Sequence, residues 1–216
     1  SITLFAISLN PHSDLRSKLI ATCICVWAIR LASFLFVRVL RAGEDSRFAR
    51  IKHQFLRFLM AWTLQGLWVT FSLAAGLAAI NSRPVAMDVF AYAGAAIWLV
   101  GFSIESLADY QKDRFRSNPE NKGKFITSGL WSWSRHPNYL GEIVLWLGIA
   151  VMAFPVLQGW QYVTLVSPVF VTILLTKISG IPLLEQAADE KWGGKADYED
   201  YKRRTSILLL LPPKGA

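Results

Sequence analysis

The sequence is poor in charged residues, which make up 18% of its 216 residues, whereas 53% are hydrophobic. Soluble domains usually carry about 25% charged residues, and here the apolar residues are bunched into long runs. The mean hydropathy of +0.35 agrees with this pattern. These features exclude an ordinary soluble domain and predict an all-α fold, a polytopic membrane helix bundle. Nine Trp residues support this prediction, because Trp favours the membrane interface.

Familiar motifs of nucleotide-binding and hydrolytic sites are missing. The sequence contains no Gly-x-Gly-x-x-Gly, no P-loop, no His-Glu-x-x-His and no Gly-x-Ser-x-Gly. Any dinucleotide must therefore be held without a Rossmann unit. Cysteine is scarce as well, since only Cys23 and Cys25 occur, inside an apolar run. Cys-x-Cys without further thiols or His nearby is a poor zinc pattern, so we expect no metal site.

The net charge of +8 raises the question of a nucleic-acid partner. Nucleic-acid binding requires a basic stripe on a soluble domain, whereas here the basic residues lie in the gaps between apolar segments. We therefore expect no nucleic-acid partner and attribute the excess charge to membrane topology. No internal repeat and no low-complexity segment is visible.

Five apolar segments are long enough to cross a bilayer core of ~30 Å at ~1.5 Å per residue. The predicted spans are residues 19–40, 55–80, 89–107, 139–154 and 162–181, the last interrupted by Pro168. A turn or helix start is expected at residues 10–14. Residues 182–206 predict an interfacial helix, a turn at Gly193-Gly194 and a second short helix.

Loop charges predict the orientation. The loops at 41–54 and 110–138 and the tail after residue 181 hold nearly all Lys and Arg, whereas the other two turns hold only Arg83. The basic regions are therefore expected on the cytoplasmic side. We predict a single integral membrane domain over residues 1–216, located in a bacterial inner membrane or the endoplasmic reticulum.

One stretch concentrates polar groups at the edge of a span: Ser134-Arg135-His136-Pro137-Asn138-Tyr139-Leu140-Gly141-Glu142. Charge near hydrocarbon is costly and usually marks a site. Arg135, with Arg114 and Arg116 upstream, can bind phosphates bidentately. Each residue alone is explained by interfacial salt bridges and by a helix N-cap at Asn138. The cluster as a whole indicates a site.

Carboxylates and amides face this basic loop from two predicted helix ends. Glu105 and Asp109 are spaced i, i+4 at the end of the third span, and Asn138 and Glu142 have the same spacing in the fourth. Asp109, Asn138 and Glu142 can hydrogen-bond a ribose or a carboxamide. Together with the arginines, they predict a cofactor site between the two helix ends.

The polar tail has two interpretations. It carries Glu185 and Asp189, then Tyr198 and Tyr201, and ends in a basic run at residues 202–204. Such runs usually contact lipid headgroups, and tyrosines spaced i, i+3 usually form an interfacial belt. The alternative is a lid that closes the cofactor pocket from the cytoplasmic side.

Two polar residues inside spans are weak candidates for catalytic residues. An Arg at mid-bilayer costs at least ~2.5 kcal/mol, so Arg30 needs a partner, a function or a route to the interface. Gln65 is equally well explained by an interhelical hydrogen bond or by a substrate contact.

The stretch from Ser134 to Glu142 resembles the signature of the steroid 5-alpha-reductase-like membrane superfamily. This superfamily includes sterol C14-reductases and, more distantly, isoprenylcysteine carboxyl methyltransferases. Leu64-Gln65-Gly66, Glu105 through Asp109-Tyr110, Arg116 and the run at residues 198–204 follow the family's order and approximate spacing. The resemblance covers the chain from about Trp27 onward, and the nearest branch is one labelled as a domain of unknown function.

The resemblance implies a helical membrane fold that holds NADPH in a cytoplasm-facing cavity. It implies a hydrophobic enone or olefin as substrate, which enters from the lipid and accepts hydride at its β carbon and a proton from a polarising acid. Asp109, Arg116, Asn138 and Glu142 match cofactor-binding positions of the reductases. The complete set of candidate cofactor-binding residues is Glu105, Asp109, Arg116, Arg135, His136, Asn138, Tyr139, Glu142, Glu185, Tyr198, Tyr201 and Arg204.

This chain departs from the family pattern at the proton donor. The family's catalytic Glu lies upstream of residue 1, and its partner Tyr aligns near Arg30. Either the natural chain carries a further N-terminal helix, or this branch polarises its substrate differently. Glu105 also stands where steroid reductases have an amide. We therefore assign no proton donor.

Three functions compete at this point. The leading prediction is an NADPH-dependent reductase of a lipid double bond, similar to 3-oxo-5-alpha-steroid 4-dehydrogenases. The second is an S-adenosylmethionine-dependent methyltransferase, in which Glu185 and Arg204 hold the amino acid end of the cofactor. The many arginines favour NADPH, and the methyltransferases typically have a Glu-Glu pair where this chain has Leu184-Glu185. The third is a non-enzymatic protein that binds membrane lipids.

Overall fold

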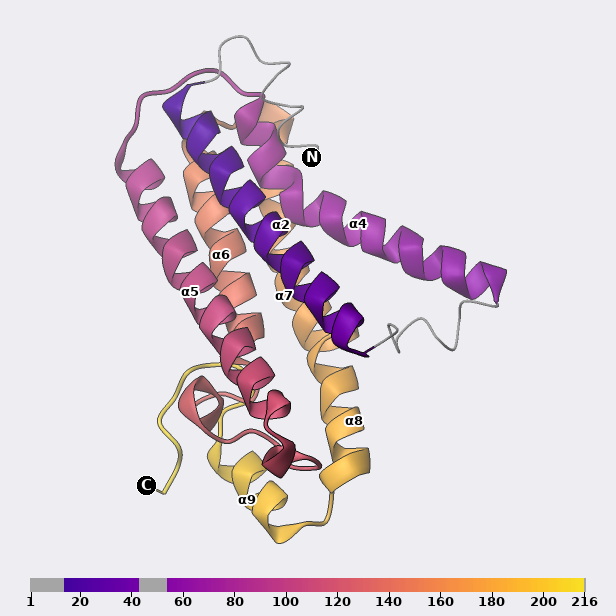
Figure 1. Ribbon diagram of the computed structural model, residues 1–216. Helices are drawn as coiled ribbons and strands as arrows, with labels where there is room; N and C mark the ends of the chain where they lie inside the picture. Colours follow the sequence, from indigo (N-terminus) through magenta and orange to yellow (C-terminus); the bar gives the residue numbers. More distant parts are fainter. Residues whose placement is uncertain (1–13, 43–53, 216) are drawn as a thin grey trace. The chain divides into compact units, whose positions relative to one another are not determined.

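The computed structural model describes residues 14–42 and 54–215 (Figure 1). Within these ranges every regular element is helical, and the one strand-like feature is an isolated bridge between Ser134 and Ser206. Most of the turn expected at residues 10–14 and of the basic loop at 41–54 lies outside the described residues.

The elements follow the chain as α2 (Leu15–Ala42), α4 (Phe55–Ile80), α5 (Val89–Ser117), α6 (Pro137–Ala153), α7 (Val166–Ile173), α8 (Ile181–Trp192) and α9 (Ala196–Arg204). Short 3-10 helices lie at Pro119–Asn121, Gly129–Ser132, Phe154–Val156 and Gly159–Leu165, and a π-helix lies at Leu174–Ile178. Five described stretches are long and apolar enough to cross a membrane: Leu15–Val37, Phe55–Ile80, Val89–Ser117, Pro137–Val156 and Gly159–Trp192. The predicted all-α polytopic membrane bundle is confirmed, and the chain is an integral multi-pass membrane protein.

The third predicted span ends too early. Helix α5 continues to Ser117, so residues 110–117 are helical rather than part of a loop. The helix stops where Asn118 accepts a hydrogen bond from the Glu120 backbone N–H (3.0 Å) and Pro119 follows. A residue before proline is disfavoured in the helical conformation, which explains the boundary.

The fourth helix begins at Pro137, whose fixed φ and missing N–H suit the first helical position. The carbonyl of His136 accepts hydrogen bonds from the backbone N–H groups of Tyr139 (3.2 Å) and Leu140 (3.3 Å). Asn138 is therefore the second residue of the helix and not its N-cap, which corrects the alternative role considered for it.

The fifth segment is interrupted at a different place from the one expected. Pro168 lies in the first turn of α7, where proline is tolerated, and the helix does not break there. The interruption comes after the π-helix, at Ser179 and Gly180. The predicted pair of short helices around Gly193-Gly194 is confirmed by α8 and α9, and Gly194 adopts a φ of +80°.

The described chain divides into two compact units, each presented by itself. The described part of the first comprises residues 14–42, 54–93 and 149–167, and that of the second comprises residues 94–148 and 168–215. In the first unit, α2 starts beside Asp14, which accepts the Ser17 backbone N–H (2.8 Å), four residues earlier than predicted. Trp27 of α2 meets Trp68 of α4 edge-on, with ring centroids 6.1 Å apart.

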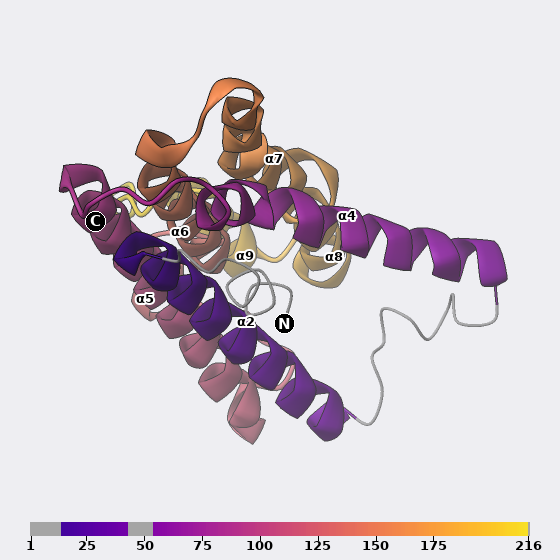
Figure 2. The same ribbon diagram turned by 90° about the horizontal axis from the view of Figure 1, so that it is seen from above.

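The two halves of α4 have different surroundings. Its buried residues lie between Ser72 and Ile80, whereas large side chains between Phe55 and Leu67 are exposed. Figure 2 shows α4 diverging from α2 along this exposed half. Gln65 lies there and is exposed. Arg30 is half-buried on α2, with its guanidinium 5.6 Å from the ring centre of Phe34.

In the second unit, α5 and α6 pack antiparallel with their backbones in close approach. A Cβ added to Gly141 would lie 2.5 Å from the Glu105 nitrogen, and one added to Gly101 would lie 2.4 Å from the Leu145 nitrogen. Only glycine fits such contacts, as is common between membrane helices. This packing fixes Glu105 beside the first turns of α6.

Candidate functional site

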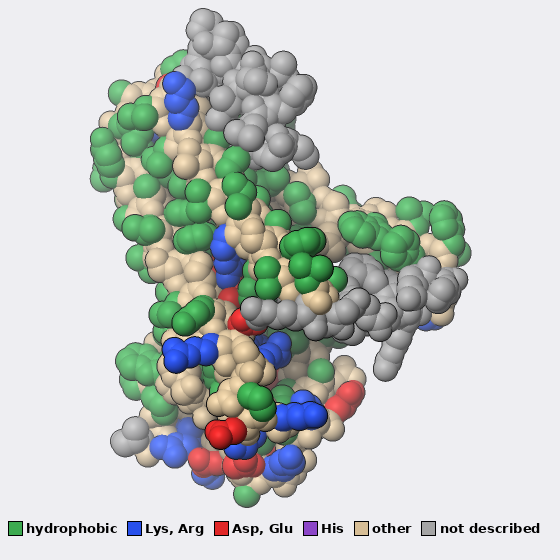
Figure 3. All heavy atoms as spheres, in the orientation of Figure 1, with side chains coloured by type: hydrophobic (Ala, Val, Ile, Leu, Met, Phe, Trp, Pro, Cys, Tyr) green, Lys and Arg blue, Asp and Glu red, His purple; other side chains and the backbone are tan. Residues whose placement is uncertain are grey.

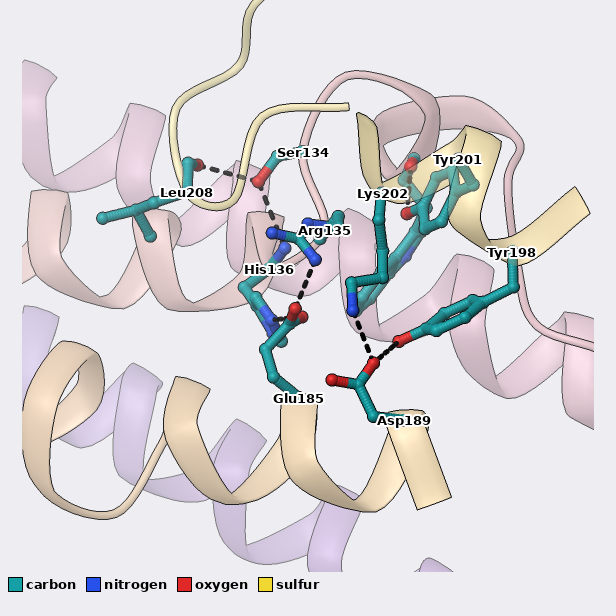
Figure 4. A network of polar contacts seen from close by, with 10 residues as sticks. Ser134, Arg135, His136, Glu185, Asp189, Tyr198, Tyr201, Lys202 and Leu208 are labelled. Carbon is teal, nitrogen blue, oxygen red and sulfur yellow. Dashed lines mark hydrogen bonds and ion pairs between the residues drawn. The ribbon is translucent and has the colours of Figure 1, made fainter. Parts of the chain in front are cut away.

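The turn before α6 is held in place by the C-terminal tail. The Arg135 backbone N–H donates to the Ser206 carbonyl (2.8 Å). The Ser134 hydroxyl donates to the Leu208 carbonyl (2.8 Å), as Figure 4 shows. The same hydroxyl oxygen accepts the His136 backbone N–H (3.2 Å). These bonds fix the direction in which the next two side chains point.

Both of these side chains meet one carboxylate. Arg135 donates from Nη1 to Glu185 Oε2, and His136 Nε2 lies 2.7 Å from Glu185 Oε1 (Figure 4). The three side chains are mostly covered, with exposed fractions of 14% for Arg135, 6% for His136 and 20% for Glu185. Tyr139 stacks on the His136 ring with centroids 5.7 Å apart. Glu185 of α8 thus bridges two basic side chains of the turn.

His136 is neutral near pH 7. Burial lowers the pKa of His136, and the hydrogen bond to Glu185 offsets only part of that effect. Because a carboxylate accepts, the imidazole carries its proton on Nε2 and donates to Glu185. The other nitrogen, Nδ1, is buried and has no hydrogen-bond partner among the residues that the structure describes.

A second set of contacts joins α8 to α9. Asp189, one turn beyond Glu185, accepts from Lys202 Nζ (2.7 Å) and from the Tyr198 hydroxyl (3.1 Å) (Figure 4). The Tyr201 hydroxyl donates to the Trp131 carbonyl (2.7 Å). Burial raises the pKa of Tyr198 and of Tyr201, so both phenols stay protonated.

An aromatic cluster forms one wall of the site. Phe125 lies 5.7 Å from Trp192, 5.2 Å from Tyr198 and 5.6 Å from Tyr201 between ring centres. Trp192 donates its indole N–H to the Gly123 carbonyl (2.6 Å), which ties the loop to the end of α8. The tyrosines therefore face the protein interior, which argues against an interfacial belt, and the lid remains a prediction.

These groups enclose a pocket of about 300 Å³. That volume is at the lower end of the roughly 300–1,000 Å³ typical of small-molecule sites. Its charged lining residues are Lys112, Arg116, Lys124, Arg135, Lys191 and Glu185. Lys112 Nζ lies 4.2 Å from the Trp131 ring centre, and Lys191 Nζ lies 4.6 Å from that of Trp192. With His136 neutral, the lining carries five cations and one carboxylate, which favours an anionic ligand.

The space-filling view in Figure 3 shows where charged side chains gather on the surface. Charged side chains gather around α9 at one end of the second unit, whereas hydrophobic side chains cover the long helices. The pocket therefore lies among the polar groups rather than along the apolar helix surfaces.

The structure brings part of the predicted site together. Of the candidate residues, Arg116, Arg135, His136, Glu185, Tyr198 and Tyr201 line the pocket. Tyr139 reaches it indirectly, through its stack on His136.

The remaining candidates lie elsewhere in the second unit. Glu105 and Asp109 are buried on α5, and Asn138 and Glu142 are half-buried at the start of α6; none of the four lines the pocket. Arg204 lines a separate, more open cavity of about 550 Å³. Its guanidinium donates to the carbonyls of Lys214 and Gly215, both at 3.1 Å.

Several pocket residues were not predicted: Lys112, Phe115, Lys124, Trp131, Lys191 and Trp192. Those on α5 were overlooked because the third span was ended at residue 107. The spacing of Ala108, Lys112 and Phe115 places them on one helix face, so continuing the helical pattern would have found them. Trp131, in the short 3-10 helix Gly129–Ser132, gave no such signal.

Among the described residues, no group of three or more His, Cys, Asp and Glu side chains can hold a metal ion.

Residues 1–205 match the family described as "Protein of unknown function (DUF1295)". The chain belongs to this family. Together with the relatives below, the match confirms the resemblance to the steroid 5-alpha-reductase-like superfamily.

Some curated relatives are named as sterol reductases or steroid dehydrogenases, and one is named as a methyltransferase. The Delta(14)-sterol reductase of Neurospora crassa is 31% identical over 109 residues, covering 44% of this chain and 20% of the relative. The 3-oxo-5-alpha-steroid 4-dehydrogenase 1 of Bos taurus is 33% identical over 69 residues, covering 32% and 26%. A protein of Ustilaginoidea virens named "Probable O-methyltransferase ustE" is 36% identical over 66 residues, covering 31% and 23%.

Each of these alignments covers about a quarter of the relative's length or less. No solved structure gives a significant match to the chain.

Proposed function

We propose that this protein is a membrane-embedded, NADPH-dependent reductase of a carbon–carbon double bond in a steroid, sterol or other hydrophobic lipid. The observation that carries the proposal is the charge of the pocket, whose lining has five cations and one carboxylate. The names of the reductase relatives support the reaction class.

The cationic lining suits the phosphate groups of NADPH. Arg135 offers a guanidinium, which binds phosphate oxygens bidentately, and Lys112 and Lys191 offer ammonium groups held against tryptophan rings. The aromatic faces of the pocket suit stacking with a planar base. We therefore assign the phosphate-bearing part of the cofactor to this pocket.

When bound, NADPH supplies a hydride. The chain's own residues position the cofactor: Glu185 orients Arg135 and His136, and Tyr139 holds the imidazole by stacking. A neutral His136 offers a hydrogen-bond acceptor at Nδ1 without adding charge. The proton donor for the substrate is left unassigned, and Arg30 and Gln65 remain weak candidates for a catalytic role.

Cofactor binding tests the proposal directly. The detergent-purified full chain is titrated with NADPH and with S-adenosylmethionine by calorimetry, and by quenching of tryptophan fluorescence, since Trp131 and Trp192 line the pocket. We expect saturable binding of NADPH and none of S-adenosylmethionine. The reverse result would overturn the proposal, and binding of neither would favour a lipid-binding protein without enzymatic function.

A methyltransferase is the second candidate, favoured by the similarity to the Ustilaginoidea virens protein and by the presence of Glu185 in the pocket. In that function Glu185 would hold the ammonium group of S-adenosylmethionine. Two observations weigh against it. The cofactor's sulfonium is a cation, which the cationic lining of the pocket would repel. Arg204, the expected partner of the cofactor's carboxylate, lines a different cavity.

A further inference from the structure

The C-terminal tail that holds the Ser134–His136 turn presents apolar side chains outward. Ile207, Leu209 and Leu211 are 45%, 54% and 49% exposed. Leu208 and Leu210, between them, are half-buried. The backbone bends at residues 207–209, and the Leu211 N–H donates to the Leu209 carbonyl (2.9 Å), so the tail turns here and leaves the other three side chains exposed.

A tryptophan extends this outward face. Trp133 is 47% exposed, and its carbonyl accepts the Leu211 backbone N–H (3.3 Å). We call Trp133, Ile207, Leu209 and Leu211 the tail patch. Single exposed apolar residues are common, but four that lie on one short, hydrogen-bonded segment and its neighbouring turn indicate an apolar partner.

The position of the patch indicates what that partner is. The tail bonds to Ser134 and Arg135, and the candidate span Pro137–Val156 begins two residues later. The patch therefore lies at the level where α6 enters the bilayer. In Figure 1 the yellow tail passes the lower ends of α5 and α6.

The patch also lies close to the end of α5. Leu210 and Trp133 border a shallow hollow with Gln111 of α5. On the same end of α5, Leu107 and Tyr110 are 47% and 60% exposed. Leu107 and Tyr110 precede Gln111 in a candidate membrane span, so the patch lies near a surface that is expected to face lipid.

We infer that the tail patch is seated in the interfacial layer of the bilayer and forms a membrane-anchored strap over the Ser134–His136 turn. Trp133 suits this layer, because its ring is apolar and its N–H is polar. Lys214, an exposed basic residue that follows the patch, suits lipid headgroups. The lipid contact thereby supports the backbone bonds that position Arg135 and His136.

The test measures depth in the membrane. Single cysteines are placed at Leu209 and, as a matched control, at Arg203, in the full chain with Cys23→Ala and Cys25→Ala. Each is labelled with an environment-sensitive fluorophore and reconstituted into phosphatidylcholine nanodiscs. Quenching is compared between iodide in the water and nitroxide groups on the upper acyl chains of the lipid.

We expect the label at 209 to be quenched at least threefold more strongly by the acyl-chain nitroxides than the label at 203, and the order to reverse with iodide. Equal iodide quenching at both positions would overturn the inference, as would protection at 209 that is lost on dilution to one chain per nanodisc, which would indicate a second copy as the partner. If the Leu209→Cys variant does not fold, Leu211→Cys gives the same comparison. The readout does not depend on which cofactor the pocket binds.

Discussion

The role of Glu185 differs between the two candidate enzymes, the reductase and the methyltransferase. In the structure the Glu185 carboxylate bonds to Arg135 and His136. These are the groups to which a phosphate of NADPH would be attracted. Removing its charge by Glu185→Gln removes a repulsion toward phosphate. We expect NADPH to bind about three- to tenfold more tightly, a gain on the order of 1 kcal/mol.

For a methyltransferase the same variant has the opposite effect, because the carboxylate would hold the cofactor's ammonium group. Calorimetric titration of Glu185→Gln with both cofactors distinguishes the two. Glu190→Gln, on the exposed side of α8, is the matched control and should leave both affinities unchanged. Weaker NADPH binding by Glu185→Gln would show that our assignment of the carboxylate is wrong.

His136 gives the protein an acid sensitivity. Its pKa in the folded state is below the ordinary value of 6.5. Well above pH 6.5 the imidazole is neutral in both states and its stabilising contribution is complete. As the pH falls below that value, the unfolded chain takes up a proton that the folded chain does not, so this contribution to stability is lost.

Thermal unfolding in detergent between pH 5 and pH 7.5 measures the effect. We expect the decrease in Tm on acidification to be smaller in His136→Gln than in the unchanged protein. Carboxylates contribute to acid sensitivity in both proteins equally, so the difference between the two isolates His136. An identical decrease in both would exclude a lowered pKa of this residue.

Among the helices, the close glycine contact between α5 and α6 leads to a prediction about the free energy of unfolding. The Cβ of Gly141→Ala would lie 2.5 Å from the Glu105 backbone nitrogen, so the helices must separate. Overpacking of this kind costs about 1–3 kcal/mol. Gly66→Ala is the control, because its Cβ would have no neighbour within 4 Å.

Unfolding followed by circular dichroism should show a lower Tm for Gly141→Ala and an unchanged or slightly higher Tm for Gly66→Ala, since alanine favours helix. Equal Tm values for both variants would contradict the close packing of α5 on α6.

The elements also show what the sequence could predict. Hydrophobic length identified the five spans, because crossing a bilayer needs a long apolar run. Asn118-Pro119 marks the true end of α5. The predicted span stopped earlier because the residues after Leu107 are mostly polar, and polar residues can continue a helix beyond the apolar part. The motif identified Arg135 and His136, but their pairing with Glu185, about 50 residues away, depends on tertiary folding and left no local pattern.

For the whole molecule, the charge distribution predicts orientation. The loop with Lys122 and Lys124 is basic, whereas the turn after α4 has Arg83 as its only Lys or Arg residue. By the positive-inside rule we expect the former to face the cytoplasm. In cells, a membrane-impermeant maleimide should label Ser82→Cys and spare Lys122→Cys until the membrane is opened. Labelling in the opposite order would reverse the proposed topology and place the pocket outside.

The central claim is that the cationic pocket binds NADPH, and the most direct test is calorimetric titration of Arg135→Ala against Arg203→Ala. Arg135 lines the pocket, whereas Arg203 is not among the residues that line it. Loss of a charge-assisted contact to phosphate costs about 1.5–3 kcal/mol. We therefore expect a Kd for NADPH roughly ten- to a hundredfold higher in Arg135→Ala and unchanged within about twofold in Arg203→Ala. Equal affinity in both variants would place the cofactor elsewhere and contradict this account.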